Sequence, residues 1–145
     1  MIRNMIGSNI EHCAEILCSV YNNTLWQCRW SLNTAKEYLH DYFESKKFIG
    51  FILEIEGNVC GAMFCDEKIW WNNSELLIDE MFVQPQLQGK GYGSKLIDTA
   101  TNYVKEHKLA GFTLSTNRYA PAPQFYKKNG FIDCEHILFM CKEIE

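Results

Sequence analysis

Three glycines at alternate positions separate an apolar run from an amphipathic one, in the segment Gln88–Gly93. Glycine lets a backbone approach a ligand closely, and the first N–H groups of a helix have no partner within it. The helix dipole favours negative charge at the same place. The segment therefore predicts a site for a phosphate-bearing ligand where a helix begins, and Lys90 adds a positive charge.

Two common phosphate-binding motifs do not fit this segment. A nucleotide-binding P-loop ends in Gly-Lys-Ser or Gly-Lys-Thr, whereas this chain has Gly93, Ser94 and Lys95 in that order. A dinucleotide-binding turn requires a third glycine or an alanine, and Ser94 occupies that position. Neither motif therefore accounts for the three glycines.

Asp79 and Glu80 form an acidic pair inside the apolar run Leu76–Val83. A carboxylate can accept a proton from an amine, directly or through water, or bind a cationic group. Adjacent strand residues point to opposite faces, so only one of the two faces a ligand unless a bulge intervenes. The alternative is a structural ion pair with a lysine or arginine, because buried carboxylates rarely lack a partner. For Glu80 these two interpretations are level.

The spacing of apolar residues predicts the elements that must position these groups. Helical spacing indicates four helices, and strand-like runs bounded by turn residues indicate six strands. The helices are expected at 8–22, after a cap at Asn33 or Thr34, after the glycine segment, and from Pro121, which suits a first turn. The strands are expected at Met1–Ile6, Phe48–Ile55, Val59–Ile69, Leu76–Val83, Phe112–Ser115 and Ile132–Ile144.

Length and composition limit the classes of function. The 145 residues suit a single domain over residues 1–145, and 47% of them are hydrophobic, so a packed core is expected. The net charge of −4 at pH 7 argues against nucleic-acid binding. No apolar run has the length of a membrane span, and the first residues lack a signal peptide's apolar core. Seven scattered cysteines predict free thiols in a reducing cytoplasm and no metal site.

The pattern Gln-x-x-Gly-x-Gly after Val-x-Pro resembles the pyrophosphate loop of the GNAT superfamily of acetyl-CoA-dependent N-acetyltransferases. The matching positions are Val83, Gln88, Gly91 and Gly93. A second segment, Phe125–Phe131, is similar to the helix-turn-strand signature of that family, and the two motifs have the family's order and separation. The resemblance implies an α/β (α+β) acyltransferase fold, a mixed and mostly antiparallel sheet flanked by helices, with acetyl-CoA as co-substrate.

The resemblance also implies roles for individual residues. The main chain of Met81, Phe82 and Val83 would bond the acetyl and pantetheine groups, with a β-bulge in this strand turning backbone groups toward them. Tyr126 matches a tyrosine that often gives a proton to the departing thiolate, and the unperturbed pKa of a phenol is ~10. Asn117 lies near the place of an asparagine that bonds the pantetheine arm, or it forms a turn. The pyrophosphate would be held by the amides of Gln88, Gly89, Lys90, Gly91, Tyr92, Gly93 and Ser94.

The implied reaction is acetyl transfer to a primary amine by direct attack in a ternary complex. Some aminoglycoside and polyamine acetyltransferases of the family have an acid at the position of Glu80, which favours Glu80 over Asp79 as base or as acceptor-binding group. A small cationic amine is the expected acceptor, and a protein amine or a non-catalytic CoA-binding module are the alternatives. Many relatives are homodimers. Several aromatic residues lie in the regions expected to form the acceptor pocket: Trp26, Trp30, Tyr38, Tyr42, Trp70 and Trp71. Aromatic rings around the pocket would suit an organic cation, although core packing explains most of these residues better.

Overall fold

The computed structural model describes residues 1–145. The chain divides into two compact units, a first unit of Met1–Ser115 and a second unit of Thr116–Glu145. Each unit is described by itself below. The expectation that residues 1–145 make a single domain stays a prediction.

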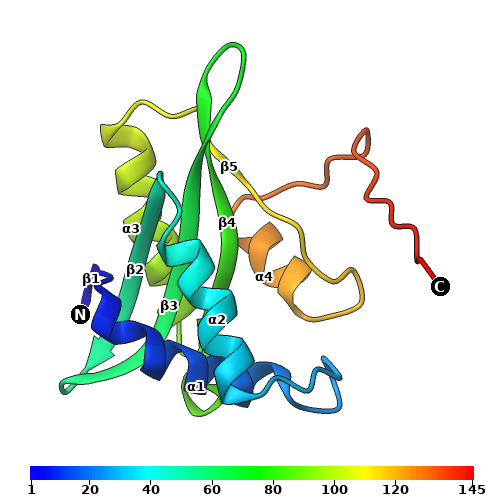
Figure 1. Ribbon diagram of the computed structural model, residues 1–145. Coiled ribbons are helices and arrows are strands. Elements are labelled where there is room, and N and C mark those ends of the chain that lie inside the picture. Colours follow the sequence, from blue (N-terminus) through cyan, green and yellow to red (C-terminus); the bar gives the residue numbers. More distant parts are fainter. The chain divides into compact units, whose positions relative to one another are not determined.

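A five-stranded sheet forms the centre of the first unit (Figure 1). The strands follow one another in chain order across the sheet, and all neighbours are antiparallel except β4 and β5, which are parallel. The predicted mixed, mostly antiparallel sheet flanked by helices is confirmed. The strands are β1 (Ile2–Asn4), β2 (Phe48–Ile55), β3 (Asn58–Ile69), β4 (Ser74–Val83) and β5 (Phe112–Thr113).

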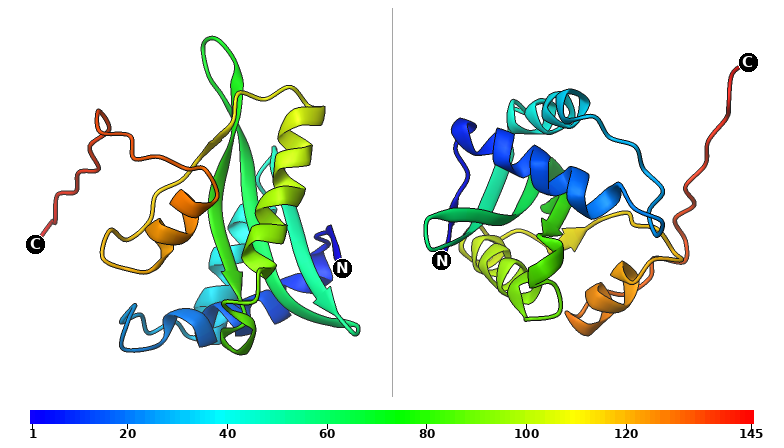
Figure 2. Two further views of the ribbon diagram at one scale, coloured as in Figure 1. Left: turned by 180° about the vertical axis from the view of Figure 1, so that it is seen from behind. Right: turned by 90° about the horizontal axis from the view of Figure 1, so that it is seen from below.

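Helices cover both faces of this sheet. The helices α1 (Ile10–Tyr21) and α2 (Leu32–Phe43) lie on one face, and α3 (Tyr92–Glu106) lies on the other (Figure 2). Two short 3-10 helices, Gly7–Asn9 and Pro85–Leu87, precede α1 and follow β4. The expected cap of α2 at Asn33 or Thr34 is wrong, because the Ser31 hydroxyl accepts the Thr34 N–H at 3.0 Å and so caps the helix two residues before Asn33.

The hydrophobic core under α1 and α2 joins both helices to three strands. Leu17 and Leu39 are fully buried there, against Ile52 of β2, Phe64 of β3 and Phe82 of β4. A Leu side chain of this kind contributes about 1.5–3 kcal/mol when it leaves water. The core therefore fixes both helices over the middle of the sheet.

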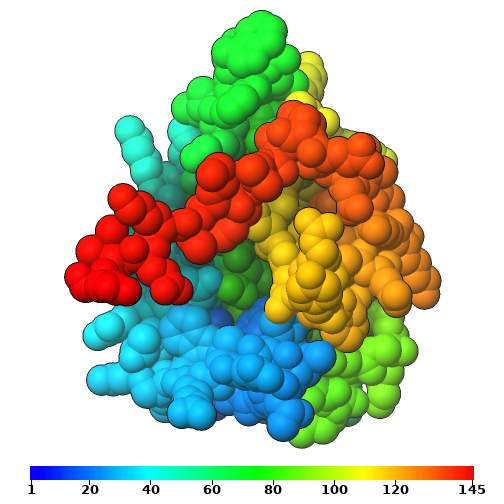
Figure 3. Space-filling model, turned by 90° about the vertical axis from the view of Figure 1, so that its right-hand side faces the viewer, coloured from blue at the N-terminus to red at the C-terminus, as the bar shows by residue number.

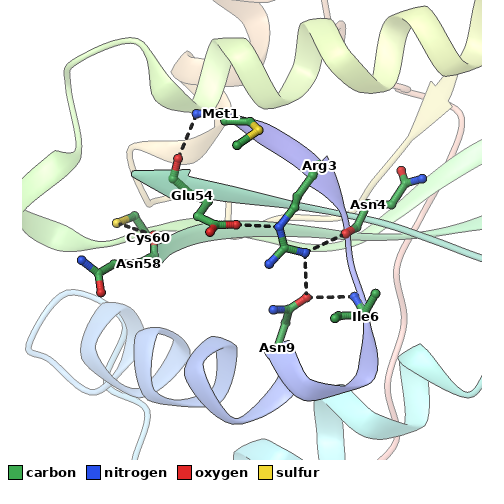
Figure 4. A network of polar contacts seen from close by, with 8 residues as sticks. All are labelled: Met1, Arg3, Asn4, Ile6, Asn9, Glu54, Asn58 and Cys60. Carbon is green, nitrogen blue, oxygen red and sulfur yellow. Dashed lines mark hydrogen bonds and ion pairs between the residues drawn. The ribbon is translucent and has the colours of Figure 1, made fainter. Parts of the chain in front are cut away.

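A polar network fastens the beginning of the chain to β2 (Figure 4). The Arg3 guanidinium pairs with the Glu54 carboxylate at 2.5 Å and donates to the Asn9 side chain at 3.4 Å. Asn9 is buried, and its amide oxygen accepts the Ile6 N–H at 2.8 Å. These bonds hold the start of α1, so that the other end of the helix, at Tyr21, is held over β4.

The β3–β4 hairpin projects beyond the layers of the first unit, and its tip is the green segment at the top of Figure 3. Ile69, Trp70 and Trp71 at this tip are 64%, 59% and 87% exposed. Both tryptophan rings lie in solvent, because the strand ends at Ile69 and the alternation of faces ends with it.

The second unit contains one helix, α4 (Ala122–Lys128). Pro121 precedes it with φ −67°, as a proline at a helix start should, and the chain leaves it through Gly130 at φ +93°. The predicted strand Ile132–Ile144 is wrong, since residues 131–145 form no strand. The run Ile137–Cys141 is apolar enough for a strand, but a strand also needs a partner for its backbone groups.

Candidate functional site

The glycine segment forms the turn between β4 and α3. The Gln88 side chain donates to the Val83 carbonyl at 3.0 Å and so closes the turn. Gly89 and Gly91 have φ of +78° and +89°, a conformation that favours glycine. A Cβ atom built at either position would meet nothing within 4 Å, so the space beside the turn is open.

The first turn of α3 presents unpaired backbone donors. Its first helical bond runs from the Lys95 N–H to the Gly91 carbonyl at 3.1 Å. The N–H groups of Tyr92, Gly93 and Ser94 precede that bond and have no partner inside the helix. The donor set and the open space are of the kind that a pyrophosphate requires, and its binding to this turn stays a prediction.

The edge of β4 that faces β5 is paired only at its beginning. Leu76 and Leu77 pair with Phe112 and Thr113, and the pairing then stops. The backbone from Ile78 onward, which includes the predicted ligand-binding residues Met81, Phe82 and Val83, has no strand on this side in the sheet. The Val83 carbonyl accepts the Gln88 side chain, and the Met81 carbonyl lies 3.5 Å from the Tyr21 hydroxyl. Apart from these two, an edge without a strand partner offers N–H and C=O groups to an extended ligand such as a pantetheine arm.

A β-bulge interrupts β4 at the acidic pair. Glu80 lies opposite Phe64, and Ile78 lies opposite Cys65, so Asp79 is an extra residue with no partner on β3. Such a bulge lets two successive side chains lie on one face of a sheet. Burial raises the pKa of Tyr42 of α2, and the negative charges of Asp79 and Glu80 raise it further, so both carboxylates lie near that ring. The sequence predicted that only one of the pair could face a ligand unless a bulge intervened, and the bulge is present.

The Glu80 carboxylate is bound by phenols from two helices. The Tyr21 hydroxyl donates to one oxygen at 3.3 Å, and the Tyr38 hydroxyl donates to the other at 2.5 Å. The Tyr42 hydroxyl donates in turn to that of Tyr38 at 3.3 Å. No lysine or arginine forms a salt bridge with Glu80, so its partners are neutral donors and the alternative of a structural ion pair is wrong.

Burial controls the electrostatics of the acidic pair. Burial raises the pKa of Glu80, the bonds from Tyr38 and Tyr21 lower it, and the charge of Asp79 raises it. Burial, followed by the charge of Asp66, raises the pKa of Asp79 to about 6, while Lys68 acts in the opposite direction. Both carboxyl groups therefore hold protons more readily than exposed acids do.

Aromatic rings surround this carboxylate. Tyr38 packs against Trp30 and Tyr42, with ring centroids 4.8 and 5.0 Å apart, and Tyr21 contacts Trp26 edge-on at 4.9 Å. Four of the six predicted aromatic residues thus belong to one cluster, whereas the two tryptophans at the hairpin tip do not. Sequence reasoning missed Tyr21. Tyr21 is the last residue of α1, and nothing in the sequence around it predicts a hydrogen bond to Glu80, which lies 59 residues later in β4.

Two predicted site residues belong to the second unit. The Tyr126 ring lies 5.2 Å from the rings of Phe125 and Phe131. Asn117 forms a turn, because its side-chain oxygen accepts the Tyr119 N–H at 2.9 Å. This bond supports the turn-forming alternative for Asn117, and the roles of both residues toward a ligand stay predictions.

A family model for the acetyltransferase (GNAT) domain matches residues 46–133, more than half of the chain. The chain belongs to the GNAT acetyltransferase family. An uncharacterized N-acetyltransferase of Methanocaldococcus jannaschii is 32% identical to this GNAT chain over 148 residues. That match covers 92% of the chain but only 61% of the archaeal protein, so the chain spans less than two thirds of this relative.

Solved structures share the GNAT fold at low sequence identity. A possible acetyltransferase from Clostridium difficile 630 has a TM-score of 0.84 at 14% identity, with 100% of this chain and 98% of that one covered. The aminoglycoside acetyltransferase AAC(6')-Iy, in complex with a CoA-containing bisubstrate analog, has a TM-score of 0.74 at 17% identity, with 99% and 98% covered. These likenesses concern the fold.

None of the helices of this GNAT chain has the length and apolar character needed to cross a membrane.

Proposed function

We propose that this chain transfers an acetyl group from acetyl-CoA to the primary amine of a small cationic acceptor. The observation that carries the proposal is the unpaired edge of β4, which runs from Ile78 to Val83 and ends at the glycine turn. A strand edge that leads to a cluster of helix N–H groups matches a ligand with an amide-bearing arm and a pyrophosphate. Acetyl-CoA, the co-substrate of the family, has both parts.

The donor side of the site is proposed to work through the main chain. Met81, Phe82 and Val83 would bond the pantetheine arm and the acetyl carbonyl, and the amides of Gln88–Ser94 would hold the pyrophosphate. Lys90 is exposed beside the turn and adds a positive charge near the phosphates. Backbone donors of this kind position the thioester and polarise its carbonyl.

Glu80 is the proposed proton acceptor on the other substrate. The amine forms a C–N bond with the acetyl carbon and the C–S bond breaks, so the amine loses a proton and the leaving thiolate gains one. Glu80 would take the first proton, and Tyr126 would supply the second. A carboxylate among aromatic rings also attracts an organic cation, which supports a cationic acceptor. Aminoglycoside acetyltransferases are among the solved structures that share this fold.

A screen of amines tests this proposal. The purified chain is given acetyl-CoA and a panel of aminoglycosides, polyamines, amino acid derivatives and peptides, and free thiol is measured. We expect amine-dependent thiol release, greatest with the small cations, and a fall in kcat of about 100-fold in Glu80→Gln, since general-base catalysis contributes 10²–10⁴-fold. Glu37→Gln is a matched control, because Glu37 is an exposed residue of α2.

Other outcomes of the screen decide against the proposal. Binding of CoA without turnover on any amine would favour a non-catalytic CoA-binding module. Turnover confined to peptides would favour a protein N-acetyltransferase. Full activity of Glu80→Gln would remove Glu80 from the mechanism and leave acetyl transfer itself in place.

A further inference from the structure

Glu80 is a largely buried carboxylate with no cation bound to it. Tyr21, from the end of α1, holds one of its oxygens, and Tyr38, from the middle of α2, holds the other. The two donors come from different helices and are 17 residues apart in the sequence, but both helices are fixed by the same core. The carboxylate is therefore held in one orientation by elements that do not move independently.

A neutral donor has a different effect on a carboxylate from that of a cation. Both stabilise the ionised form, because a hydrogen bond to a charged group contributes about 1.5–3 kcal/mol. A lysine or arginine would also cancel the negative charge, whereas a phenol leaves it in place. An ionised carboxylate has about four lone-pair sites, and the two phenols occupy two of them, so others are free for an incoming ammonium group.

The phenol beside Glu80 stays a donor. Burial, followed by the charge of Glu80, raises the pKa of Tyr38 far above its ordinary value, so its hydroxyl keeps its proton. Tyr42 donates to the same hydroxyl and is itself raised in pKa by burial. The titratable groups facing Glu80 are thus Tyr21 on α1, Tyr38 and Tyr42 on α2, and Asp79 on β4.

We propose that Tyr21 and Tyr38 are positioning residues that clamp Glu80 in its ionised form, oriented to receive an amine and uncompensated by any cation. Tyr42 supports the clamp by fixing the Tyr38 hydroxyl. The clamp rests on the proposed function, in which Glu80 meets the acceptor. It explains how a buried acid can act on a protonated amine near neutral pH, where the ammonium must first be attracted and then lose its proton.

The pH dependence of kcat/KM for the acceptor tests the clamp. In Tyr38→Phe the ionised form of Glu80 loses its shortest bond, so the acidic limb of the profile moves to higher pH by about one unit. Tyr21→Phe moves it in the same direction by less, because its bond is longer. At pH 9 both variants approach the wild-type value, whereas general structural damage would lower the rate at every pH.

Tyr103→Phe is the matched control. Tyr103 of α3 also donates its hydroxyl to a carboxylate, that of Glu67, on the opposite face of the sheet. This variant loses a phenol–carboxylate bond elsewhere, and its acidic limb stays in place. The shift of the acidic limb caused by Tyr38→Phe is also measured in the Asp79→Asn variant. If the shift persists when Asp79 cannot titrate, the acidic limb belongs to Glu80. An unshifted limb in Tyr38→Phe, with wild-type turnover present, would overturn the clamp alone.

A titration without turnover separates the two proposals. The side-chain carboxyl of Glu80 is followed by ¹³C NMR in glutamate-labelled protein and assigned by its loss in Glu80→Gln. We expect its midpoint to rise in Tyr38→Phe and to stay unchanged in Tyr103→Phe. An unchanged midpoint in Tyr38→Phe contradicts the clamp even if acetyl transfer is active. Absence of amine-dependent turnover in the wild type contradicts the proposed function, and the clamp falls with it.

Discussion

At the scale of single residues, the unusual group is Asp79. It is the extra residue of the β4 bulge, and it lies partly buried with Asp66 nearby. Sequence reasoning found the acidic pair but could not place both side chains on one face. A bulge is an unpaired residue in a ladder, and neither its residue type nor the surrounding alternation marks it.

The raised pKa of Asp79 predicts a pH-dependent stability. Its pKa is about 6 in the folded chain and 3.8 in its reference state, so the folded state binds the proton more tightly. The favourable contribution is complete below pH 3.8 and is lost as the pH rises through 6. We therefore expect Asp79→Asn to be more stable than wild type at pH 7.5 by about 1 kcal/mol, after allowance for solvent screening.

Urea unfolding at several pH values measures this difference. The gap between Asp79→Asn and wild type should shrink as the pH falls below about 6 and vanish near 4. Asp98→Asn, at an exposed position of α3, is the control. A difference in stability that widens toward acid pH would show that ionisation of Asp79 stabilises the folded chain, which contradicts the prediction.

At the scale of elements, the turn from β4 to α3 depends on backbone conformation more than on side chains. Gly91 precedes α3 with φ +89°, whereas Gly93 lies inside the helix. The two glycines are therefore present for different reasons. One is required by the fold of the turn, and the other keeps a side chain away from the proposed pyrophosphate.

Two alanine substitutions separate these reasons. Gly91→Ala should destabilise the chain by about 1–2 kcal/mol, because a Cβ is disfavoured at positive φ, and it should weaken CoA binding. Gly93→Ala should leave stability equal or higher, since alanine is the better helix former, yet still weaken CoA binding. Thermal unfolding and calorimetric titration with CoA measure the two effects. Equal loss of stability in both variants would contradict the distinction.

The elements differ in how far the sequence could predict them. The strand Phe48–Ile55 has the bounds expected, because both its alternation and its two-residue turn are local signals. The start of α3 was predictable from the glycines for the same reason. The strand expected at Ile132–Ile144 was wrong because a strand depends on a distant partner, which an apolar run does not supply. Tyr21 and Tyr38 reach Glu80 across 59 and 42 residues, and no local pattern announces such contacts.

At the scale of the whole chain, order is concentrated in the sheet of the first unit. β3 is paired on both sides, with β2 and with β4, and its Ala62, Met63, Phe64 and Cys65 are fully buried. Residues 131–145 have no ladder and contain one turn bond, from the Ile137 N–H to the Cys134 carbonyl. The chain is thus expected to open at very different rates along its length.

Amide hydrogen exchange tests this contrast. We expect the amides of 62–65 to be among the slowest to exchange, because they open only with global unfolding. The amides of 138–144 should exchange within seconds at neutral pH. Slow exchange in that run would restore the strand that the sequence predicted, and fast exchange in β3 would contradict the packing of the sheet.

The extra residue in β4 has a consequence for comparing this chain with others. Before Asp79 the even-numbered positions, Leu76 and Ile78, pack toward the α3 layer, and after it the even-numbered positions, Glu80 and Phe82, meet α1 and α2. The strand thus holds two alternations of opposite parity, so even-numbered side chains face different helices on the two sides of Asp79. A homologous strand without that residue would keep Ile78 toward α3 and Glu80 toward α1 and α2, because the two would then be neighbours in a regular alternation. A gap at this column of an alignment therefore marks the loss of the bulge, with the layers of the flanking residues unchanged.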